Sequence, residues 1–175
     1  MSNDQQALVA ETIHYGFRPT ATGLLAIAVS RHGVVAILLG ADRHELTRKL
    51  TDALPETDLV EDEPSIVAML DVVARHIADP VGEPGFDLDM RGNADERAVW
   101  TALGVIRIGE PRSYGAVAKA IKSGITAQEV GAACAANRLA IVFHCHRMLK
   151  ADGSISGYRW GVYRKRKLLA MEQAA

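Results

Sequence analysis

Cysteine is scarce in this chain of 175 residues, which contains only Cys134 and Cys145. Two cysteines are too few for the disulfide framework that stabilises small secreted domains, so we expect a reducing compartment. The chain also has no CxxC pair, the spacing typical of a structural zinc site. We therefore expect a fold held together by its core rather than by cross-links or metal.

Long apolar runs are missing as well. No stretch approaches the roughly 20 apolar residues that span a membrane, and residues 1–6 are polar, without the apolar core of a signal peptide. With 49% hydrophobic and 23% charged residues, the composition is that of an ordinary globular protein. We expect a cytoplasmic protein with no membrane partner, built as one large domain or two small ones.

Net charge is nearly absent, at -1, but the two halves of the chain differ. Residues 1–92 carry 7 Lys/Arg against 15 Asp/Glu, whereas residues 93–175 carry 13 against 6. The second half is therefore the one suited to a phosphate backbone. The basic run at residues 164–167 is expected to be the solvated face of a terminal helix.

The first half predicts a small α/β domain over residues 1–85. Strand-forming runs occupy residues 11–17, 23–30, 33–40 and 57–60. Asp42 and Glu45 have the spacing of a capping box and predict a helix start, and Pro64 predicts the start of a second helix. The second helix would bury four apolar side chains, namely Ile66, Leu70, Val73 and Ile77. No motif typical of a catalytic or ligand-binding site occurs in this half.

The second half predicts a mainly helical domain over residues 86–175. Residues 86–90 are expected to form a short strand or an extended linker. Asn93 and Glu96 would begin a helix that runs to the Gly-Glu-Pro sequence at 109–111. Helices are also expected at 114–122, 127–137 and from 162 to about 173. The middle pair has the length and glycine-containing turn of a helix-turn-helix, although plain helical bundles contain such pairs too.

The most reactive stretch is residues 141–147, an apolar run that leads into His144, Cys145, His146 and Arg147. We interpret it as a buried strand that ends at a nucleophile, because a histidine acting through a water can deprotonate a neighbouring thiol. Two alternatives remain open at this point: a small buried side chain, or zinc bound by Cys145 and the two histidines. Alternation along a strand would place Cys145 opposite both histidines, which disfavours the metal.

The flanking sequence resembles a known family. Residues 137–148, which contain Asn137 and Cys145-His146-Arg147, and the Gly-Tyr-Arg-Trp-Gly segment at 157–161 are similar to the O6-alkylguanine-DNA alkyltransferases. The similarity is greatest to the C-terminal domain of the bacterial adaptive-response methyltransferases. It implies a ribonuclease H-like α/β N-terminal domain followed by a mainly α domain of winged-helix/helix-turn-helix type. We expect the zinc-binding regulatory domain of the long adaptive-response proteins to be absent.

The resemblance also implies an activity and a set of site residues. The activity is single-turnover transfer of an alkyl group from O6-alkylguanine, extruded from double-stranded DNA, to Cys145. His146 would deprotonate the thiol through a water, Glu172 would orient His146, and Asn137 would hold the active-site turn. The DNA- and base-binding residues would be Tyr114, Gln128, Arg147, Ser156 and Gly157. The protein would work as a monomer, would bind in the minor groove, and would need neither metal nor organic cofactor.

Three positions depart from the family pattern. Gln128 replaces the arginine that fills the gap left by the flipped base, Glu129 replaces a small residue, and His144 replaces the proline before the nucleophile. Thr126 and Glu129 have capping-box spacing, so Glu129 is compatible with a role at the helix start. The departures leave two other functions open: a DNA lesion-binding or regulatory protein with little transfer, and a thiol acceptor for small alkylated molecules.

Overall fold

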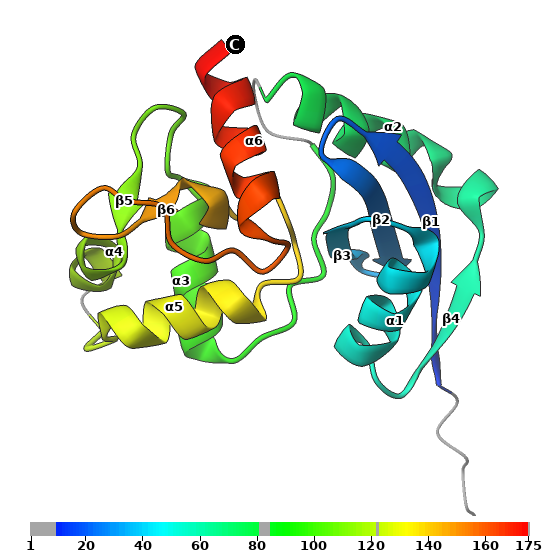
Figure 1. Cartoon of the computed structure of the whole chain (residues 1–175). Helices are drawn as coiled ribbons and strands as arrows, with labels where there is room; N and C mark the ends of the chain where they lie inside the picture. Colours follow the sequence, from blue (N-terminus) through cyan, green and yellow to red (C-terminus); the bar gives the residue numbers. More distant parts are fainter. Residues whose placement is uncertain (1–9, 81–84, 122, 175) are drawn as a thin grey trace, which may run out of the picture.

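The computed structural model describes residues 10–80, 85–121 and 123–174. Figure 1 shows two parts, a sheet with helices α1 and α2 and a helical part with α3 to α6. The sheet has the order β3-β2-β1-β4. Its first three strands are antiparallel and β4 runs parallel to β1. The strands are β1 (Glu11–Thr20), β2 (Gly23–Ser30), β3 (Gly33–Gly40) and β4 (Thr57–Glu61). This mixed sheet confirms the α/β class of the N-terminal part.

The two helices of the sheet part begin where the sequence predicts. Asp42 caps α1 (Arg43–Ala53) by accepting a hydrogen bond from the Glu45 N–H at 2.8 Å. Asp62 caps α2 (Glu63–Ala78), which carries Pro64 in its first turn. Helix α1 packs on β2 and β3, and α2 packs on β1 and β2. The apolar side chains of α2 predicted to face the core are all buried, namely Ile66, Leu70, Val73 and Ile77.

The helical part contains α3 (Ala94–Gly104), α4 (Tyr114–Ile121), α5 (Ala127–Ala136) and α6 (Val162–Ala174). Asn93 and Glu96 form the predicted capping box at the start of α3. The predicted end of α3 at 109–111 is wrong, because the helix stops at Gly104. Glycine followed by two β-branched residues has low helix propensity, and Val105 is 76% exposed. In the described parts of the chain, no helix is long and apolar enough to cross a membrane.

A short parallel pair, β5 (Arg112–Ser113) with β6 (Met148–Leu149), brings the start of α4 beside the segment that follows Cys145. Between α4 and α5, Gly124 adopts a φ of 81°, a left-handed conformation that glycine tolerates. The last residue of the expected helix 114–122, Lys122, lies outside the described residues. The pair α4 and α5 confirms the helix-turn-helix character of the C-terminal part.

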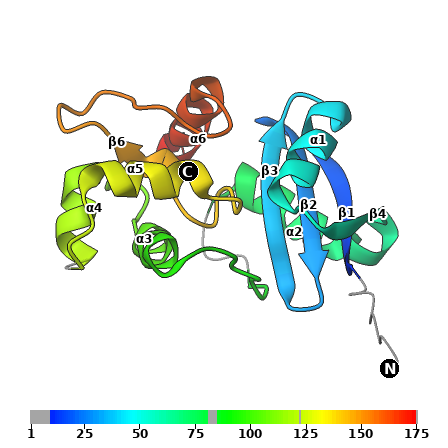
Figure 2. The same cartoon turned by 90° about the horizontal axis from the view of Figure 1, so that it is seen from below.

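The strand β3 joins the sheet part to the helical part (Figure 2). Ile37 donates its N–H to the Arg138 carbonyl at 2.8 Å and accepts from the Ala140 N–H at 2.9 Å. Val34 forms a similar bridge with Leu88, which is the only ladder contact that the described part of residues 86–90 makes. Of the two expectations for residues 86–90, the structure therefore shows the extended linker, with a single bridge to β3 instead of a strand. As a result, the loop before Cys145 is attached to the most buried strand of the sheet.

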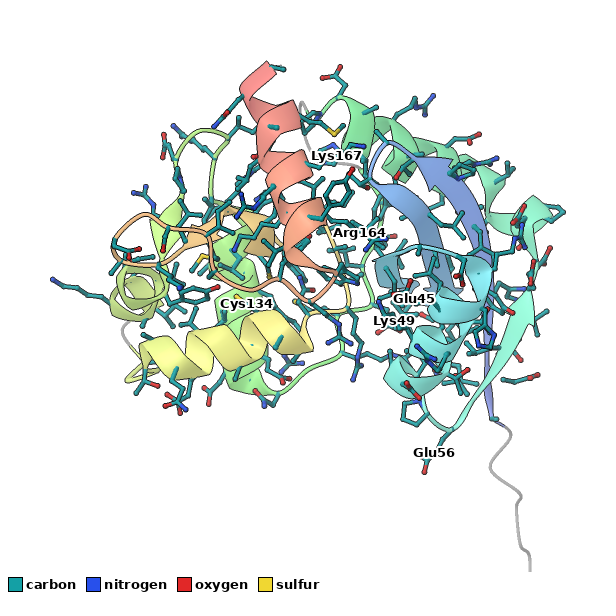
Figure 3. All side chains as sticks on the ribbon, in the orientation of Figure 1. Glu45, Lys49, Glu56, Cys134, Arg164 and Lys167 are labelled. Carbon is teal, nitrogen blue, oxygen red and sulfur yellow. The ribbon has the colours of Figure 1, made fainter. Side chains whose placement is uncertain are left out.

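The basic run at residues 164–167 is not uniformly solvated, contrary to our expectation. Lys165 is fully buried within the helical part. Arg164 lies between α6 and the sheet, where its Nε donates to the Thr22 carbonyl at 3.0 Å (Figure 3). Two of the four cations therefore stabilise the interior and the contact between the two parts of the molecule.

Candidate active site

Asn137 organises the loop that carries Cys145. Its side chain is fully buried at the end of α5. Its Oδ1 accepts from the Leu139 N–H at 2.7 Å, and its Nδ2 donates to the Cys145 Sγ at 3.2 Å. One amide thus bonds to both ends of the loop.

The loop itself is not the strand that the apolar run predicts. Residues 140–143 form a turn, and Cys145 begins a single 3₁₀ turn, η1 (Cys145–Arg147). Ile141 has a φ of 64°, which is rare for a β-branched residue. It is buried against the core at 3% exposure. The strain is therefore offset by tertiary packing and by the Asn137 hydrogen bonds.

His144, which stands where the family has proline, fits the loop by other means. Its φ of -73° lies in the range that a proline ring would impose. Its Nδ1 is 3.1 Å from the Leu103 carbonyl, so the ring is anchored to the end of α3. Burial, with a contribution from the Arg147 charge, lowers the pKa of His144 to about 3. A neutral, anchored ring of this kind is a packing residue and replaces the constraint that proline would supply.

His146, Glu172 and Arg147 form a buried cluster behind Cys145. The Nε2 atom of His146 lies 2.7 Å from Glu172 Oε1, and Arg147 donates to the same oxygen from Nη2 at 2.7 Å. Burial acts to raise the pKa of Glu172, but the hydrogen bonds from His146 and Arg147 outweigh it and lower that pKa to about 2. The carboxylate therefore stays ionised and holds the imidazole in one orientation.

The other ring nitrogen of His146, Nδ1, is buried without a hydrogen-bond partner among the described residues. Burial lowers the pKa of His146, although Glu172 acts in the opposite direction. The ring is consequently neutral near pH 7. A neutral imidazole whose Nε2 proton is directed at Glu172 has a free acceptor at Nδ1, so it can receive a proton.

Arg147 requires a correction, because we expected it among the DNA- and base-binding residues. The side chain is buried, at 5% exposure. Its guanidinium is occupied by Glu172 and by the Ile106 carbonyl. Its burial, rather than the number of its bonds, keeps the guanidinium away from a surface that DNA could contact. The structure makes Arg147 a partner of Glu172.

Cys134, to which the sequence assigns no chemical role, lies beside Cys145. It is on the side of α5 that faces the interior of the helical part (Figure 3). The neighbouring Cys134 thiol is the largest influence that lowers the pKa of the Cys145 thiol; burial acts in the opposite direction, while Asn137 and the Lys165 charge lower the pKa further. Cys134 precedes Asn137 by three residues on one helix face, so helical spacing could have identified it.

We expect Cys134→Ala to raise the pKa of the Cys145 thiol, because it deletes a hydrogen-bond donor to the thiolate. The measurement is the rate of alkylation by iodoacetamide as a function of pH, with mass spectrometry to follow Cys145. Cys134→Ser is the matched control, since serine retains a donor at that position and should shift the midpoint less. An unchanged midpoint in the alanine variant would contradict the role of Cys134.

Cys145 is one of the residues that line a pocket of about 230 Å³. The lining side chains include Tyr114, Cys134 and Tyr158, with Gly157 and Arg159 on the later segment. The Tyr158 hydroxyl is buried without a partner among the described residues. Burial raises the pKa of both tyrosines, so each hydroxyl stays protonated and can donate a hydrogen bond. We did not anticipate Tyr158, whose only sequence signal was its place in the 157–161 segment.

Lys165 supports the wall of this pocket from inside the protein. Its Nζ donates to Ser156 Oγ at 2.8 Å and to the Gly157 carbonyl at 3.3 Å. Ser156 is in turn 2.7 Å from the Tyr114 hydroxyl. Burial lowers the pKa of Lys165 to about 8, while the nearby thiols act to raise it. Tyr114, Ser156 and Gly157, which the sequence analysis grouped, are therefore brought together by a buried cation.

Gln128 lies apart from this cluster, on the exposed first turn of α5. Its neighbour Glu129 forms the capping box with Thr126, accepting from the Thr126 N–H at 2.7 Å. The capping role that the spacing predicts for Glu129 is confirmed. Across the described residues, no group of three or more potential metal ligands occurs.

The comparisons with known proteins agree with this geometry. Residues 94–174 match the family model described as 6-O-methylguanine DNA methyltransferase, DNA binding domain. The chain is 39% identical to the bifunctional transcriptional activator/DNA repair enzyme Ada of Escherichia coli over 166 residues, which are 91% of this chain and 45% of that protein. It is 34% identical to the regulatory protein ada of Salmonella typhimurium, of which it covers 46%. The chain thus spans about half the length of these two relatives.

Shorter relatives are covered more fully. The methylated-DNA--protein-cysteine methyltransferase of Mycolicibacterium paratuberculosis is 38% identical over 67% of this chain and 71% of its own length. The crystal structure of Mycobacterium tuberculosis OGT in complex with DNA superimposes with a TM-score of 0.76 at 30% identity, covering 92% of this chain and 93% of that one. On this similarity in sequence and in fold, the chain belongs to the O6-alkylguanine-DNA alkyltransferase family.

Proposed function

We propose that this protein is a single-turnover DNA-repair enzyme, a methylated-DNA--protein-cysteine S-methyltransferase that moves an alkyl group from O6 of guanine to the sulfur of Cys145. The observation that carries the proposal is the position of that sulfur. Cys145 lines a 230 Å³ pocket, its sulfur accepts a hydrogen bond from Asn137, and the pKa of its thiol is lowered. A thiolate in a pocket of nucleobase size can attack a carbon carried by the bound base.

The proposed reaction is an in-line displacement. The Cys145 thiol gives its proton to His146 Nδ1 through a water, and Glu172 holds the imidazole and stabilises its positive charge. The thiolate then forms a bond to the alkyl carbon as the bond between that carbon and guanine O6 breaks, and the electron pair leaves on the base. The departing guanine takes up a proton, and the protein retains the alkyl group as a thioether. A thioether is not readily cleaved, so each molecule acts once.

The remaining pocket residues bind the base in this proposal. Tyr114 donates to the purine ring and contacts the phosphate of the target nucleotide. Ser156 and Gly157 form the wall of the guanine site, held by Lys165. Asn137 keeps the turn and the sulfur in place. Arg147 acts indirectly, because its bonds to Glu172 hold the carboxylate that orients His146.

The proposed partner is double-stranded DNA that carries an alkylated guanine. The excess of basic residues after position 92 supports this choice. So does the pair α4 and α5, which we propose enters the minor groove, where phosphate contacts and shape suffice for a lesion in any sequence. We further propose a monomer that acts in the cytoplasm without a cofactor. The proposed domain boundary falls between residues 85 and 86, next to residues that the structure leaves undescribed.

Transfer of a labelled methyl group from duplex DNA tests this function. A duplex with one O6-methylguanine should transfer one methyl group per protein molecule, whereas an otherwise identical duplex labelled at an N-methyl purine should transfer none. A second candidate, lesion binding or regulation with little transfer, is favoured by the exposed neutral side chain of Gln128. Tight duplex binding without label on the protein would support that candidate. Transfer from free O6-benzylguanine alone would support a thiol acceptor for small alkylated molecules.

Gln128→Arg is expected to speed transfer from duplex DNA. Extrusion of a base costs a few kcal/mol, and an inserted guanidinium offsets part of this through its planar shape and its charge. Recovery of about 1.4 kcal/mol corresponds to about a tenfold faster single-turnover rate. The control substrate is free O6-benzylguanine, which needs no extrusion. Equal acceleration of both substrates would mean that position 128 acts on the pocket or on folding.

A further inference from the structure

Arg159 is a cation at the edge of the pocket, and no role has yet been assigned to it. It belongs to the 157–161 segment, and its side chain is exposed while also lining the pocket that contains Cys145. Among the residues that line this pocket, it is the one carrying a permanent positive charge. Its Nη1 donates to the Ala135 carbonyl in the last turn of α5.

Helix α5 itself offers no cation that could bind a DNA phosphate. The first turn of that helix presents neutral Gln128 and the acid Glu129, and the whole of α5 contains no lysine or arginine. A base that enters the pocket carries its phosphodiester to the pocket edge. Ala135 lies seven positions after Gln128, so the guanidinium sits about 10 Å further along the helix than position 128, at 1.5 Å of rise per residue. The Arg159 guanidinium is thus placed at the pocket. It is not placed at position 128, where a side chain would fill the gap that an extruded base leaves in the duplex.

We propose that Arg159 contacts the phosphodiester of the nucleotide whose base occupies the pocket, and so supplies binding energy that Gln128 does not. The inference rests on the proposed function and specifies how this chain holds DNA. A guanidinium can donate to a carbonyl and to phosphate oxygens together, because it has five N–H groups in one plane. The competing role is structural: a cation beside the last carbonyls of α5 stabilises the helix end whether or not DNA is present.

Salt dependence separates the two roles. We would measure binding of an O6-methylguanine duplex by fluorescence anisotropy between low and moderate salt, with Cys145→Ala in every variant so that no transfer occurs. Each lost phosphate contact should reduce the slope of log K against log salt by about 0.9 and weaken binding roughly tenfold near ~0.1 M salt. We expect both effects for Arg159→Gln, and we expect Arg159→Lys to retain most of the slope.

Arg164→Gln is the matched control. Arg164 also donates to backbone carbonyls, at 3.0 Å to Thr22 and 3.0 Å to Trp160, but it lies between α6 and the sheet (Figure 3) and is not among the residues that line the pocket. Its replacement should lower the melting temperature and leave the slope unchanged. If Arg159→Gln behaves in the same way, Arg159 is a structural residue and the proposal is wrong. Variants that unfold are identified by circular dichroism, and Arg159→Lys then provides the test.

A second measurement uses Cys145 intact. The ratio of single-turnover rates on duplex and on free O6-benzylguanine should fall about tenfold in Arg159→Gln, since only the duplex brings a phosphate. Equal losses on both substrates would overturn the proposal. If the wild type transfers no alkyl group from either substrate, the proposed enzyme activity fails. The salt slope still decides whether Arg159 contacts DNA.

Discussion

Replacement of Glu172 by alanine is expected to lower the free energy of unfolding by about 3–5 kcal/mol, the cost of breaking a buried ion pair from one side. The carboxylate is 7% exposed and accepts from Arg147 and from His146, in each case at 2.7 Å. Without it, the Arg147 guanidinium stays buried with the Ile106 carbonyl as its remaining bonded partner among the described residues. Urea denaturation at pH 7, followed by circular dichroism, measures the change.

The matched control is Glu110→Ala. Glu110 pairs with Arg112 at 3.3 Å, but both side chains are about half exposed. An exposed pair of this kind contributes about 0–1 kcal/mol. Similar small losses in both variants would show that the Glu172 cluster contributes little to stability, and the structural role that we give to Arg147 would then be wrong.

The same cluster predicts a pH dependence. The pKa of Glu172 falls from its ordinary value of 4.5 to about 2 in the folded protein, so folding favours the ionised form. A depressed pKa contributes stability that is complete above the unfolded value and is lost as the pH falls through the folded value. The stability difference between wild type and Glu172→Gln should therefore shrink between pH 5 and pH 2. A constant difference would indicate that charge is not its source.

The second large effect concerns the rate of transfer. His146→Ala is expected to slow single-turnover transfer by about a hundredfold to ten-thousandfold near pH 7, the usual contribution of a general base. The loss should decrease at high pH, where the Cys145 thiol ionises without help. Glu172→Gln should also slow transfer, because it removes the charge that stabilises protonated His146 while it preserves the size of the side chain.

Because His146 and Glu172 act as one unit, the reductions in transfer rate caused by the two substitutions should not multiply. The double variant His146→Ala with Glu172→Gln should be little slower than the worse single variant. Folding of each variant is verified first, by the denaturation measurement above. Losses that multiply, or an unchanged rate in His146→Ala, would contradict the relay and would require another proton acceptor for the thiol.

Local signals in the sequence predicted much of the fold. Side chains such as Asn93 and Thr126 accept hydrogen bonds from the free N–H groups of the first helical turn. The start of a helix can therefore be predicted from a stretch of only four residues. The strands of the sheet and the buried face of α2 follow from hydrophobic spacing in the same way. The end of α3 was misplaced because the Gly-Val-Ile sequence at 104–106 carries an apolar pattern that continues past the last helical hydrogen bond.

The Cys145 loop could not be predicted from its own residues. An apolar run of this length has the same pattern in a buried strand and in a buried turn. The choice is made by Asn137, whose amide bonds to Leu139 and to Cys145, and by the attachment of the loop to β3. Both are tertiary contacts, which no short sequence window contains.

The charged residues of the site were harder still. Arg147 and Lys165 resemble surface cations in the sequence, yet both are buried. Burial of a cation is favourable only where hydrogen-bond acceptors replace the water that it loses. Glu172 is the acceptor for Arg147, and Ser156 in the pocket wall is an acceptor for Lys165. Those partners come from segments 25 and 9 residues away, respectively. The resemblance grouped Cys145, His146 and Glu172, but it gave no indication that Arg147 belongs beside Glu172.

The most direct test of the account is the location of the transferred methyl group. Trypsin separates the two thiols, because cleavage after Arg138 and Arg147 leaves Cys145 in the peptide 139–147 and Cys134 in the preceding one. After reaction with an O6-methylguanine duplex, we expect the mass of one methylene to be added to the peptide 139–147. Cys145→Ala should remain folded and acquire no label. Label on the Cys134 peptide, or undiminished transfer by the Cys145→Ala variant, would contradict the central claim.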